Sequence, residues 1–281
     1  MPYSTHGLSA ETVALLTDAG LRPLDVESLA VRALEEDVDG GVDVTTVATV
    51  PMEQRGRLAL VARGGGVVAG LVVARAIFEV VCGDDMTCDV SVEEGSLVEL
   101  DTELMAVTSS THNLLRAERP ALNAVSHLSG IATATRAWVA AIADTDASVR
   151  DTRKTTPGLR GVEKYAVRAG GGVNHRMNLA DAALVKDNHV EASGGVGEAF
   201  RAVRRAFPEI PIEVEVDTLE QLDVAIDAGA DLILLDNFSV QEMAEAVRRT
   251  SGRALLEASG GLTLDQAAAV AATGVDYLAV G

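Results

Sequence analysis

The chain has 281 residues, of which 48% are hydrophobic and 3% aromatic, and it carries a formal net charge of −19. This length and apolar content suit one large α/β domain or two smaller ones. The negative charge opposes association with nucleic acid. The two cysteines, Cys82 and Cys88, are too few for a disulfide framework or a zinc cluster, so we expect free thiols and a reducing cytosol.

The N-terminus has no basic region followed by an apolar core and a small-residue cleavage site, so it does not resemble a signal peptide. The most apolar run, Val67 to Cys82, is interrupted by Gly70, Arg75 and Glu79. It is also too short to cross a bilayer. We therefore expect a cytoplasmic protein with no membrane partner.

The first hundred residues predict a small mixed module. Residues 1–24 look like a loosely tied terminus, and Asp25 to Val38 is typical of a helix with Asp25 as its N-cap. Short β-type runs then occupy residues 55–107 around one helix-like segment, LVVARAIFEVV. This pattern predicts an α+β module with a small antiparallel sheet.

Residues 111–143 have helical composition, and Pro120 and Gly130 predict breaks in it. We expect Pro120 to begin a new helix, because proline is favoured in the first turn and disrupts a helix interior. Arg119 would then project from a helix junction. The simpler alternative for Arg119 is an intramolecular salt bridge.

From residue 147 onward, short apolar runs alternate with amphipathic stretches. The six runs are SVRDTRK, ALVKDN, IEVEVD, LILLDN, ALLEASGG and DYLAVG. Such alternation predicts a parallel sheet, and five successive units favour a closed or nearly closed α/β barrel. We therefore divide the chain into a domain at residues 1–120 and a barrel at residues 121–281, bridged by the helix at 111–143.

The segment from Arg150 to His189 is basic within this acidic chain. It contains all three lysines, and its eight Lys/Arg against four Asp/Glu give a net charge of +4. A solvated helix face is the ordinary explanation of a charge run. Here the basic residues are interleaved with GGG and apolar runs. The segment therefore predicts a pocket for a small anion.

Nearly every apolar run of the barrel region ends in polar residues, and parallel strands place such ends on one face. These residues are Asp151, Arg153, Lys154, Lys186, Asp187, Glu215, Asp217, Asp236, Asn237, Glu257, Ser259, Gly260, Gly261 and Gly281. Enzymes with such barrels build their active sites on this face.

The chemistry of these residues sorts into three groups. The first group consists of cations that can bind carboxylates and phosphates, through the planar guanidinium of arginine or the localised charge of lysine. Its members are Arg153, Lys154, His175, Arg176 and Lys186. Glu215 and Asp236 suit Mg²⁺ carried by a phosphorylated substrate. The turns Ser259-Gly260-Gly261 and 279–281 resemble phosphate loops of barrels. Each residue alone has a simpler alternative, such as a structural role for His175 or an arginine partner for Glu215.

These motifs together closely resemble one family. RDTRKTTPGLR, KYAVRAGGGVNHR, ALVKDNH, EVEVD, LILLDN and ASGG occur in the order found in quinolinate phosphoribosyltransferases, and LLRAERPALNAVSHLSGIAT and DVTT fit as well. The resemblance implies an N-terminal α/β sandwich domain and an open, incomplete α/β barrel. It also implies a homodimer, or a higher oligomer, with shared active sites.

The resemblance further implies the reaction. Quinolinate and phosphoribosyl pyrophosphate (PRPP) would react with Mg²⁺ to give nicotinate mononucleotide, pyrophosphate and CO₂ in NAD biosynthesis. Arg119 of the neighbouring subunit would surround the quinolinate carboxylates with Arg153, His175 and Arg176. Other roles implied for the matching positions are substrate contact by Thr152, Lys154 and Lys186, ribose and Mg²⁺ binding by Glu215 and Asp236, and 5′-phosphate binding by Ser259, Gly260, Gly261 and Gly281.

Two alternatives remain at this point. One is the related phosphoribosyltransferase-like protein associated with molybdate transport, which shares the barrel motifs. The other is a non-catalytic module that binds a phosphate ligand. Quinolinate phosphoribosyltransferases usually continue past the strand that ends in the sequence AVG, here residues 279–281. We therefore also expect the phosphate loop at Gly281 to be incomplete.

Overall fold

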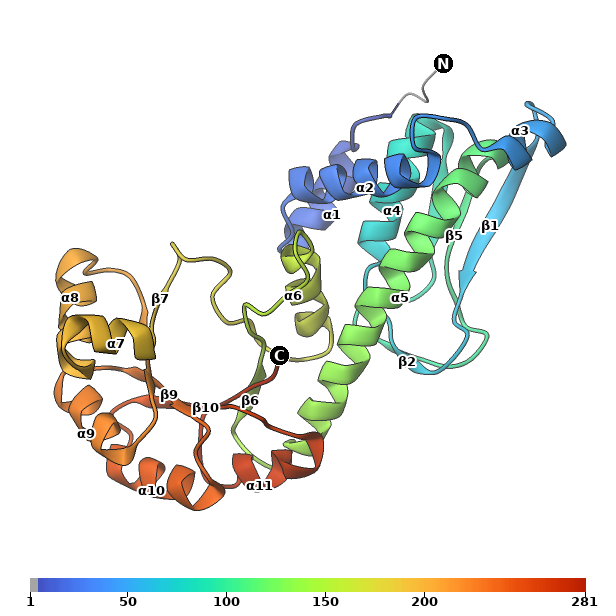
Figure 1. Cartoon of the computed structure of the whole chain (residues 1–281). Coiled ribbons are helices and arrows are strands. Elements are labelled where there is room, and N and C mark those ends of the chain that lie inside the picture. Colours follow the sequence, from blue (N-terminus) through green and yellow to red (C-terminus); the bar gives the residue numbers. More distant parts are fainter. Residues whose placement is uncertain (1–4) are drawn as a thin grey trace. The chain divides into compact units, whose positions relative to one another are not determined.

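The computed structural model describes residues 5–281, which divide into two compact units. Unit 1 runs to Ala134 and also includes Gly161–Gly170, whereas unit 2 comprises Thr135–Arg160 and Gly171–Gly281. The boundary predicted at residue 120 falls within helix α5 (Thr111–Ala141), which continues from one unit into the other (Figure 1).

Unit 1 contains short strands packed with helices, in agreement with the α+β module that the sequence predicts. Its helices are α1 (Ala10–Asp18), α2 (Pro23–Val38), α3 (Val44–Thr49), α4 (Leu71–Cys82), the 3₁₀ turn η1 (Gly83–Asp85), most of α5 and most of α6 (Arg160–Ala169). Its strands are β1 (Arg55–Val61), β2 (Gly66–Val67), β3 (Thr87–Val90), β4 (Leu97–Val98) and β5 (Glu103–Ser110).

The predicted antiparallel sheet is confirmed. Strand β5 lies between β1 and β3 and pairs antiparallel with both, while β2 and β4 form a separate antiparallel pair. Helix α4 is apolar on nearly all sides, since ten of its twelve residues are buried. It therefore forms the centre of the hydrophobic core of unit 1.

Two expectations about the first forty residues are wrong. The described part of the predicted loose terminus contains α1, which is anchored by the fully buried side chains of Thr12 and Leu16. Helix α2 begins at Pro23 rather than after an Asp25 cap, because proline at the first helical position needs no N–H partner. Residues 1–4 of the predicted terminus lie outside the described part.

The predicted break at Pro120 is also wrong. Helix α5 runs through Pro120 and Gly130 without interruption. Ala117 and Ala121, which flank the proline, are fully buried, and Leu114 and Leu128 are nearly so. We infer that this burial outweighs the one helical hydrogen bond that proline cannot donate.

Unit 2 is a parallel sheet wrapped by helices. Its strands are β6 (Ser148–Arg150), β7 (Ala183–Val185), β8 (Ile212–Val216), β9 (Leu232–Asp236), β10 (Leu255–Ser259) and β11 (Tyr277–Ala279). Its helical segments are α7 (Asp187–Ser193), α8 (Val196–Ala206), α9 (Leu219–Asp227), α10 (Val240–Thr250), η2 (Leu264–Gln266) and α11 (Ala267–Ala271).

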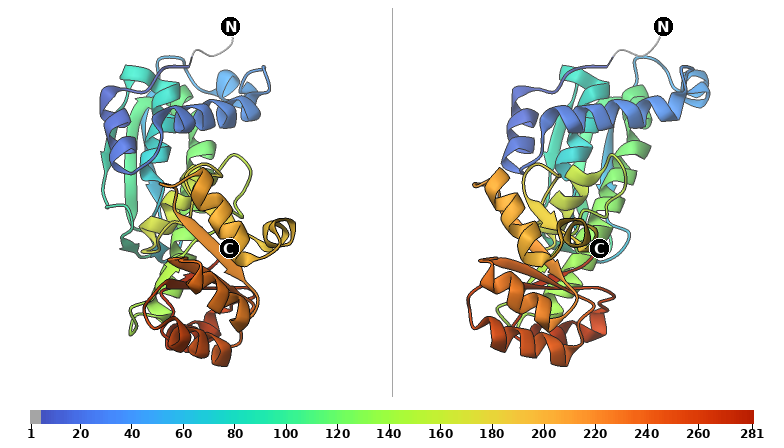
Figure 2. Two further views of the ribbon diagram at one scale, coloured as in Figure 1. Left: turned by 90° about the vertical axis from the view of Figure 1, so that its left-hand side faces the viewer. Right: turned by 60° about the vertical axis from the view of Figure 1, so that its left-hand side comes forward.

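The sheet of unit 2 has the order β6-β11-β10-β9-β8-β7, and every pairing is parallel. Strands β6 and β7 are its two edges, so the described strands form an open barrel, as expected. Helices α8 to α11 lie along the outer side of the curved sheet (Figures 1 and 2). Their apolar faces and the outer faces of the strands form one core, which includes Phe200, Leu222 and Met243.

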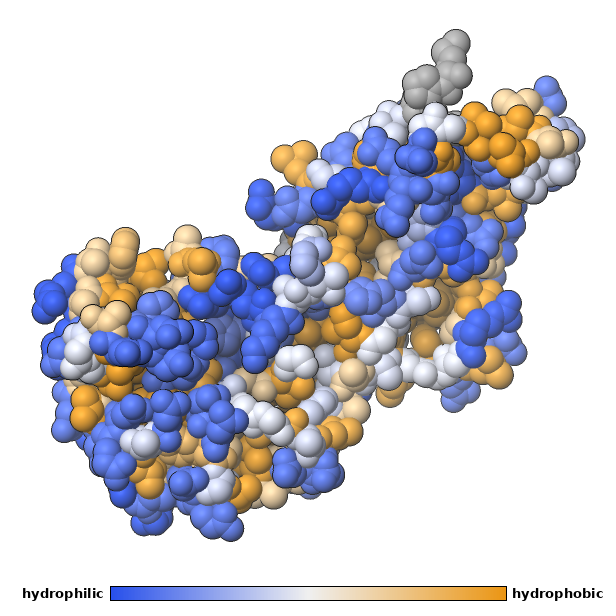
Figure 3. Space-filling view, in the orientation of Figure 1, coloured by the Kyte–Doolittle hydropathy of each residue, from blue (hydrophilic) through white to orange (hydrophobic). Residues whose placement is uncertain are grey.

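Two features of the surface bear on function. Among residues 5–281, no helix is both long and apolar enough to cross a membrane. On unit 1, four apolar side chains in and beside α3 are exposed, namely Val42, Val44, Val47 and Met52. They contribute to the hydrophobic patch around α3 that Figure 3 shows at the upper right.

Candidate active site

A cavity of about 400 Å³ opens at the carboxyl ends of the strands of unit 2. All six strands, or the residues that directly follow them, contribute to it. Its lining consists of Thr152, Arg153, Lys154, His175, Arg176, Leu184, Lys186, Glu215, Leu234, Asp236, Glu257, Ser259 and Ala279. Nine of the thirteen predicted site residues are therefore gathered around a single cavity, as expected for the carboxyl face of a barrel.

Two of the cations on the cavity wall have no counter-ion within the described chain. The Arg153 guanidinium and the Lys154 ammonium are exposed, and neither makes a hydrogen bond or ion pair with any side chain or backbone group of residues 5–281. Only the Lys154 backbone is fixed, through a 3.0 Å bond from its N–H to Thr152 Oγ1. These two side chains are available to an anionic ligand.

Arg176 is held more firmly. Its Nη1 donates to the Ala182 carbonyl at 3.0 Å, and the residue lines the cavity. Partial burial and the nearby Arg153 charge lower the pKa of Arg176. The pKa is depressed because two like charges face one another with incomplete solvation. An anion placed between them would relieve this repulsion.

Lys186 and Glu215 form an ion pair across neighbouring strand ends. Lys186 Nζ lies 2.5 Å from Glu215 Oε2. Lys186 follows β7 at the N-cap of α7, and its backbone N–H donates to His189 Nδ1 at 3.0 Å. His189, which the sequence places in the basic segment, thus orients the start of α7.

The turn after β10 approaches the turn after β9 very closely. The backbone N–H of Asn237 donates to the Ser259 carbonyl at 2.9 Å, and its Nδ2 donates to Asp236 Oδ2 at 2.8 Å. Gly260 has φ +93°, and a Cβ there would lie 2.8 Å from the Asn237 nitrogen. Only glycine fits both the backbone angle and the space.

The second predicted phosphate turn is adjacent to the cavity floor. A Cβ built on Gly281 would lie 3.4 Å from Thr152 Oγ1. Gly260, Gly261 and Gly281 are not in the cavity lining itself, but they follow Ser259 and Ala279, which are. Glycine places no side chain over these turns, and the Val280 N–H between Ala279 and Gly281 is engaged by the Arg150 carbonyl at 2.9 Å.

Glu215 and Asp236 both line the cavity, on adjacent strands β8 and β9. Mg²⁺ prefers one or two carboxylates together with phosphate oxygens and water. A pair of carboxylates beside unpaired cations suits a Mg²⁺ ion that arrives with a phosphorylated ligand. The donor set therefore fits the predicted metal.

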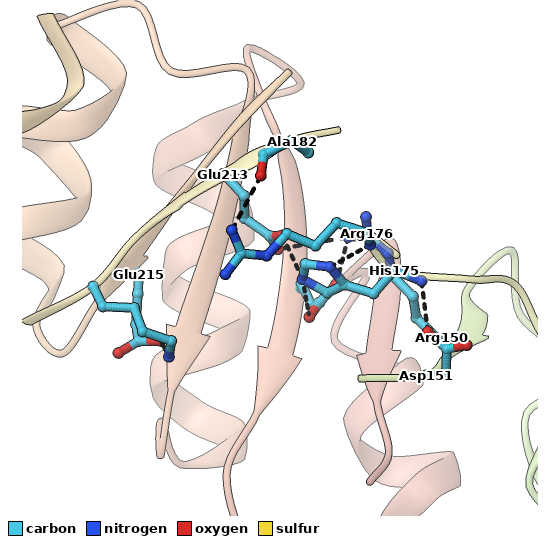
Figure 4. A network of polar contacts seen from close by, with 9 residues as sticks. Arg150, Asp151, His175, Arg176, Ala182, Glu213 and Glu215 are labelled. Atoms are coloured by element: carbon cyan, nitrogen blue, oxygen red, sulfur yellow. Dashed lines mark hydrogen bonds and ion pairs between the residues drawn. The ribbon is translucent and has the colours of Figure 1, made fainter. Parts of the chain in front are cut away.

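His175 lines the cavity but is largely buried, and it belongs to a network of buried charged side chains that we call the buried layer (Figure 4). Its Nε2 lies 2.7 Å from Glu213 Oε2 and 3.9 Å from Glu257 Oε1. Arg150 Nη1 lies 2.6 Å from Glu257 Oε2 and 3.5 Å from Glu213 Oε1. Burial and the Glu213 charge raise the pKa of Glu257 to about 8.

The polar residues predicted for the site include His175 and Glu257 but neither Arg150 nor Glu213, although the strands carry a signal for them. Residues two apart in a strand face the same side. Glu213 precedes Glu215 by two positions and Glu257 precedes Ser259 by two, so each forms the layer below a cavity residue. Charged residues at inward positions of otherwise apolar strands are the pattern that indicates such a layer.

Besides the three glycines of the turns, one predicted site residue is not part of the cavity lining. Arg119 belongs to unit 1, where it lies exposed on α5. Its side chain makes no hydrogen bond or ion pair with residues 5–281, so the salt bridge considered as its alternative is absent from the described chain.

Comparison with known proteins decides the family. Residues 43–129 match the N-terminal domain of quinolinate phosphoribosyl transferase, and residues 131–281 match its C-terminal domain. The chain belongs to the quinolinate phosphoribosyltransferase family. It is thus a member of a family of pentosyltransferase enzymes, and the open barrel lies within the match to the family's C-terminal domain.

Individual relatives agree with this family assignment. The chain is 54% identical to a nicotinate-nucleotide pyrophosphorylase (carboxylating) of Mycobacterium leprae, covering 89% of each sequence. It is 38% identical to a probable enzyme of the same name from Bacillus subtilis, covering 92% of this chain and 89% of the relative. None of these names supports the molybdate-associated alternative.

Solved structures show the same family fold. NadC from Streptococcus pyogenes superposes with a TM-score of 0.88 at 38% identity, over 93% of this chain and 92% of that one. The nicotinate-nucleotide pyrophosphorylase of Francisella tularensis has a TM-score of 0.86 at 34% identity, over 92% and 90% of the two chains. The α/β class and open barrel predicted from the sequence are therefore confirmed.

Proposed function

We propose that this chain transfers the phosphoribosyl group of PRPP to quinolinate, with loss of one carboxylate, to give nicotinate mononucleotide, pyrophosphate and CO₂. The observation that carries the proposal is the cavity of unit 2, where Arg153 and Lys154 are unpaired within residues 5–281 and the charge of Arg153 acts on Arg176. Such a site favours a small molecule with several negative charges. Family membership supplies the identity of the two substrates.

In this proposal the arginines bind the acid. Arg153 and Arg176 carry planar guanidinium groups, whose paired N–H donors match the two oxygens of a carboxylate better than an ammonium does. His175 has a different role from the direct carboxylate contact that the sequence suggested, because both of its ring nitrogens are already engaged by the protein. The arginines would therefore orient the quinolinate ring nitrogen toward the ribose carbon C1′.

Lys154 and Lys186 would contact the oxygens of PRPP, and Glu215 and Asp236 its ribose hydroxyls. As the C1′–pyrophosphate bond breaks, the lysines offset the charge on the leaving group and the carboxylates favour a positive ribose. The N–C1′ bond forms at the same carbon. When the carboxylate next to the new bond leaves as CO₂, the positively charged ring nitrogen stabilises the electron pair left behind, which then takes a proton.

We propose that Glu215 and Asp236 hold Mg²⁺ when it arrives with PRPP. The ion would supply charge neutralisation on the pyrophosphate. The turns that end in Gly261 and Gly281 would direct backbone N–H groups at the 5′-phosphate. Thr152 and Ser259, which line the cavity, would add hydroxyl donors to the same anion.

We further propose a homodimer in which Arg119 completes the site of the neighbouring subunit. Two observations support it: Arg119 has no partner within residues 5–281, and unit 1 exposes the apolar patch around α3. An exposed apolar patch is typical of an interface. A cytoplasmic location is supported by the two free cysteines.

The direct test is an absorbance assay for nicotinate mononucleotide, with quinolinate, PRPP and Mg²⁺ as reactants. Nicotinate is the control acid, because it lacks the second carboxylate and would leave one cavity cation unpaired. We expect turnover of quinolinate only, with nicotinate disfavoured by roughly a hundredfold or more. Turnover of neither acid, together with no calorimetric binding of quinolinate, would refute the proposed function.

A further inference from the structure

The buried layer beneath the cavity has no assigned role in binding or catalysis. Glu213 has a side chain that is only 3% exposed, and it reaches His175 from strand β8. It is not part of the cavity lining, unlike Glu215 two residues later. Glu213 therefore acts on the reaction only through the residues that it contacts.

Hydrogen bonds fix the tautomer of the His175 ring. The backbone N–H of Arg176 donates to His175 Nδ1 at 2.7 Å, so Nδ1 carries no proton. The ring proton must then lie on Nε2, which donates to Glu213 Oε2 at 2.7 Å. The imidazole thus connects the Glu213 carboxylate to the main chain of Arg176 (Figure 4).

The main chain around His175 is held from a second side. Asp151 Oδ1 accepts the N–H of His175 at 2.7 Å, and its Oδ2 accepts Nδ2 of Asn174 at 2.6 Å. Asp151 therefore sets where the segment lies, while Glu213 sets how the ring is turned. The ring orientation decides whether the Arg176 N–H keeps its acceptor.

The charges of the layer suit this fixed role. Arg150 is the cation that faces both Glu213 and Glu257, and its guanidinium also lies 4.9 Å from the centre of the Tyr277 ring. His175, Glu213 and Glu257 are grouped closely enough to ligate a metal ion. Arg150 already supplies the positive charge there, so we assign the layer a positioning role.

We propose that Glu213 is a positioning residue, which orients Arg176 for quinolinate by holding His175 as its Nε2–H tautomer. This inference rests on the proposed function, and it adds a residue that sets the affinity of the same site for quinolinate. Among residues 5–281, the Arg176 guanidinium has one hydrogen-bond partner, the Ala182 carbonyl. A small rotation of the Arg176 backbone would therefore move its guanidinium group within the cavity.

The test compares two substitutions of Glu213. Glu213→Ala removes the acceptor of Nε2–H, whereas Glu213→Gln keeps an oxygen that accepts the same proton. We expect Glu213→Ala to raise KM for quinolinate by roughly 10- to 100-fold and to leave KM for PRPP within about threefold. Glu213→Gln should recover most of the loss. Unchanged KM for quinolinate in folded Glu213→Ala would overturn the proposal.

A second readout does not depend on activity. The chain has only five histidines, so ¹⁵N NMR of the rings is tractable, and His175→Asn identifies the His175 signals. We expect the Nε2–H tautomer in the wild type and in Glu213→Gln, and a mixture in Glu213→Ala. An Nδ1–H or doubly protonated wild-type ring at neutral pH would contradict the inference even if the enzyme turned over no substrate.

The chain offers a matched control in unit 1. Glu163 Oε1 lies 2.9 Å from His127 Nε2, which makes another glutamate–histidine pair with a buried carboxylate, but neither residue lines the cavity. Glu163→Ala should lower stability and leave the KM for quinolinate unchanged. Equal increases in KM for both alanine variants would show a general loss of structure and would overturn the positioning role.

Discussion

Lys186 Nζ and Glu215 Oε2 lie 2.5 Å apart at the ends of neighbouring strands, where both line the cavity of unit 2. Lys186 is one of the cations proposed to bind the oxygens of PRPP, and Glu215 is one of the carboxylates proposed to bind its ribose hydroxyls. In the ligand-free chain each neutralises the other. Binding of an anion to Lys186 must therefore compete with Glu215, which keeps the lysine ordered before substrate arrives.

Lys186→Ala should reduce turnover by about 10²- to 10³-fold, because a cation that offsets charge on the leaving pyrophosphate is lost. Lys186→Arg should recover only part of the rate, since the planar guanidinium of arginine does not reproduce the compact charge of the lysine ammonium. The side chain of Lys186 is 46% exposed, so neither change should unfold unit 2. Steady-state rates with both substrates saturating measure the effect.

Arg205→Ala is the control for this loss of charge. Arg205 is an exposed cation on α8 in the same unit, outside the cavity lining. Its removal should leave the rate within about twofold, because surface charges away from special features contribute little. If Lys186→Ala were as active as Arg205→Ala, Lys186 would have no role at the reacting groups.

Gly260→Ala and Gly261→Ala should differ, although both glycines have positive φ. A Cβ at Gly260 would lie 2.8 Å from the Asn237 nitrogen, whereas a Cβ at Gly261 meets nothing within 4 Å. Gly261→Ala should lower the free energy of unfolding by about 1–2 kcal/mol, the cost of a left-handed backbone angle for alanine. Gly260→Ala should be destabilised by more and should also raise KM for PRPP, because the turn must move.

The single tryptophan makes this comparison possible. Trp138 packs against the hydrophobic core of unit 2, so its fluorescence reports the unfolding of that unit in urea. Equal unfolding midpoints for the two glycine variants would contradict the close approach of the two turns.

The strand ends of unit 2 were predictable because the physics there is local. Short apolar runs with period-two alternation fix which side chains face inward, and parallel pairing brings their ends together. That reasoning predicted the positions of Lys154, Lys186, Glu215 and Asp236 around one cavity. It needed no knowledge of how distant elements pack.

The errors arose where packing between distant elements decides the outcome. Helix α5 continues through Pro120 because its flanking residues are buried, a fact that no local rule contains. Helix α6 was not predicted at all, and its buried residues include the charged Glu163 and Lys164. The inward charges of Arg150, Glu213 and Glu257 can be read along their strands, but their meeting in one layer depends on the order of the sheet, in which β6, β10 and β8 alternate with β11 and β9.

The stability of unit 2 should depend on pH through Glu257. Burial and the Glu213 carboxylate raise the pKa of Glu257 to about 8, above the ordinary 4.5 of the unfolded chain. The folded state therefore holds the proton more tightly. This contribution is fully present below pH 4.5 and is lost as pH rises through 8, with a slope of at most about 1.4 kcal/mol per pH unit.

Glu257→Gln isolates this contribution, because glutamine stays neutral in both states. Its free energy of unfolding, followed by Trp138 fluorescence between pH 5 and 9, should fall less steeply than that of the wild type. Arg150 donates to Glu257 at 2.6 Å and keeps an acceptor in the amide oxygen. Parallel curves for the two proteins would show that Glu257 ionises normally in the folded chain.

Arg119 provides the last prediction, which concerns assembly. If Arg119 completes the site of the neighbouring subunit, a dimer of one Arg119→Ala chain and one Lys186→Ala chain contains one intact site. Random association makes half of the dimers mixed, so two inactive variants together should regain roughly a quarter of wild-type activity. Refolding them as a mixture and measuring the rate of nicotinate mononucleotide formation tests this.

The matched control mixes Lys186→Ala with Glu215→Ala. Both residues line the cavity of the same unit, so every site in the mixed dimer still lacks one of them. This mixture should stay inactive, because exchange of subunits cannot unite the two intact side chains. Recovery in the Arg119 mixture alone would therefore assign Arg119 to the partner's site, and recovery in neither would confine each site to one chain.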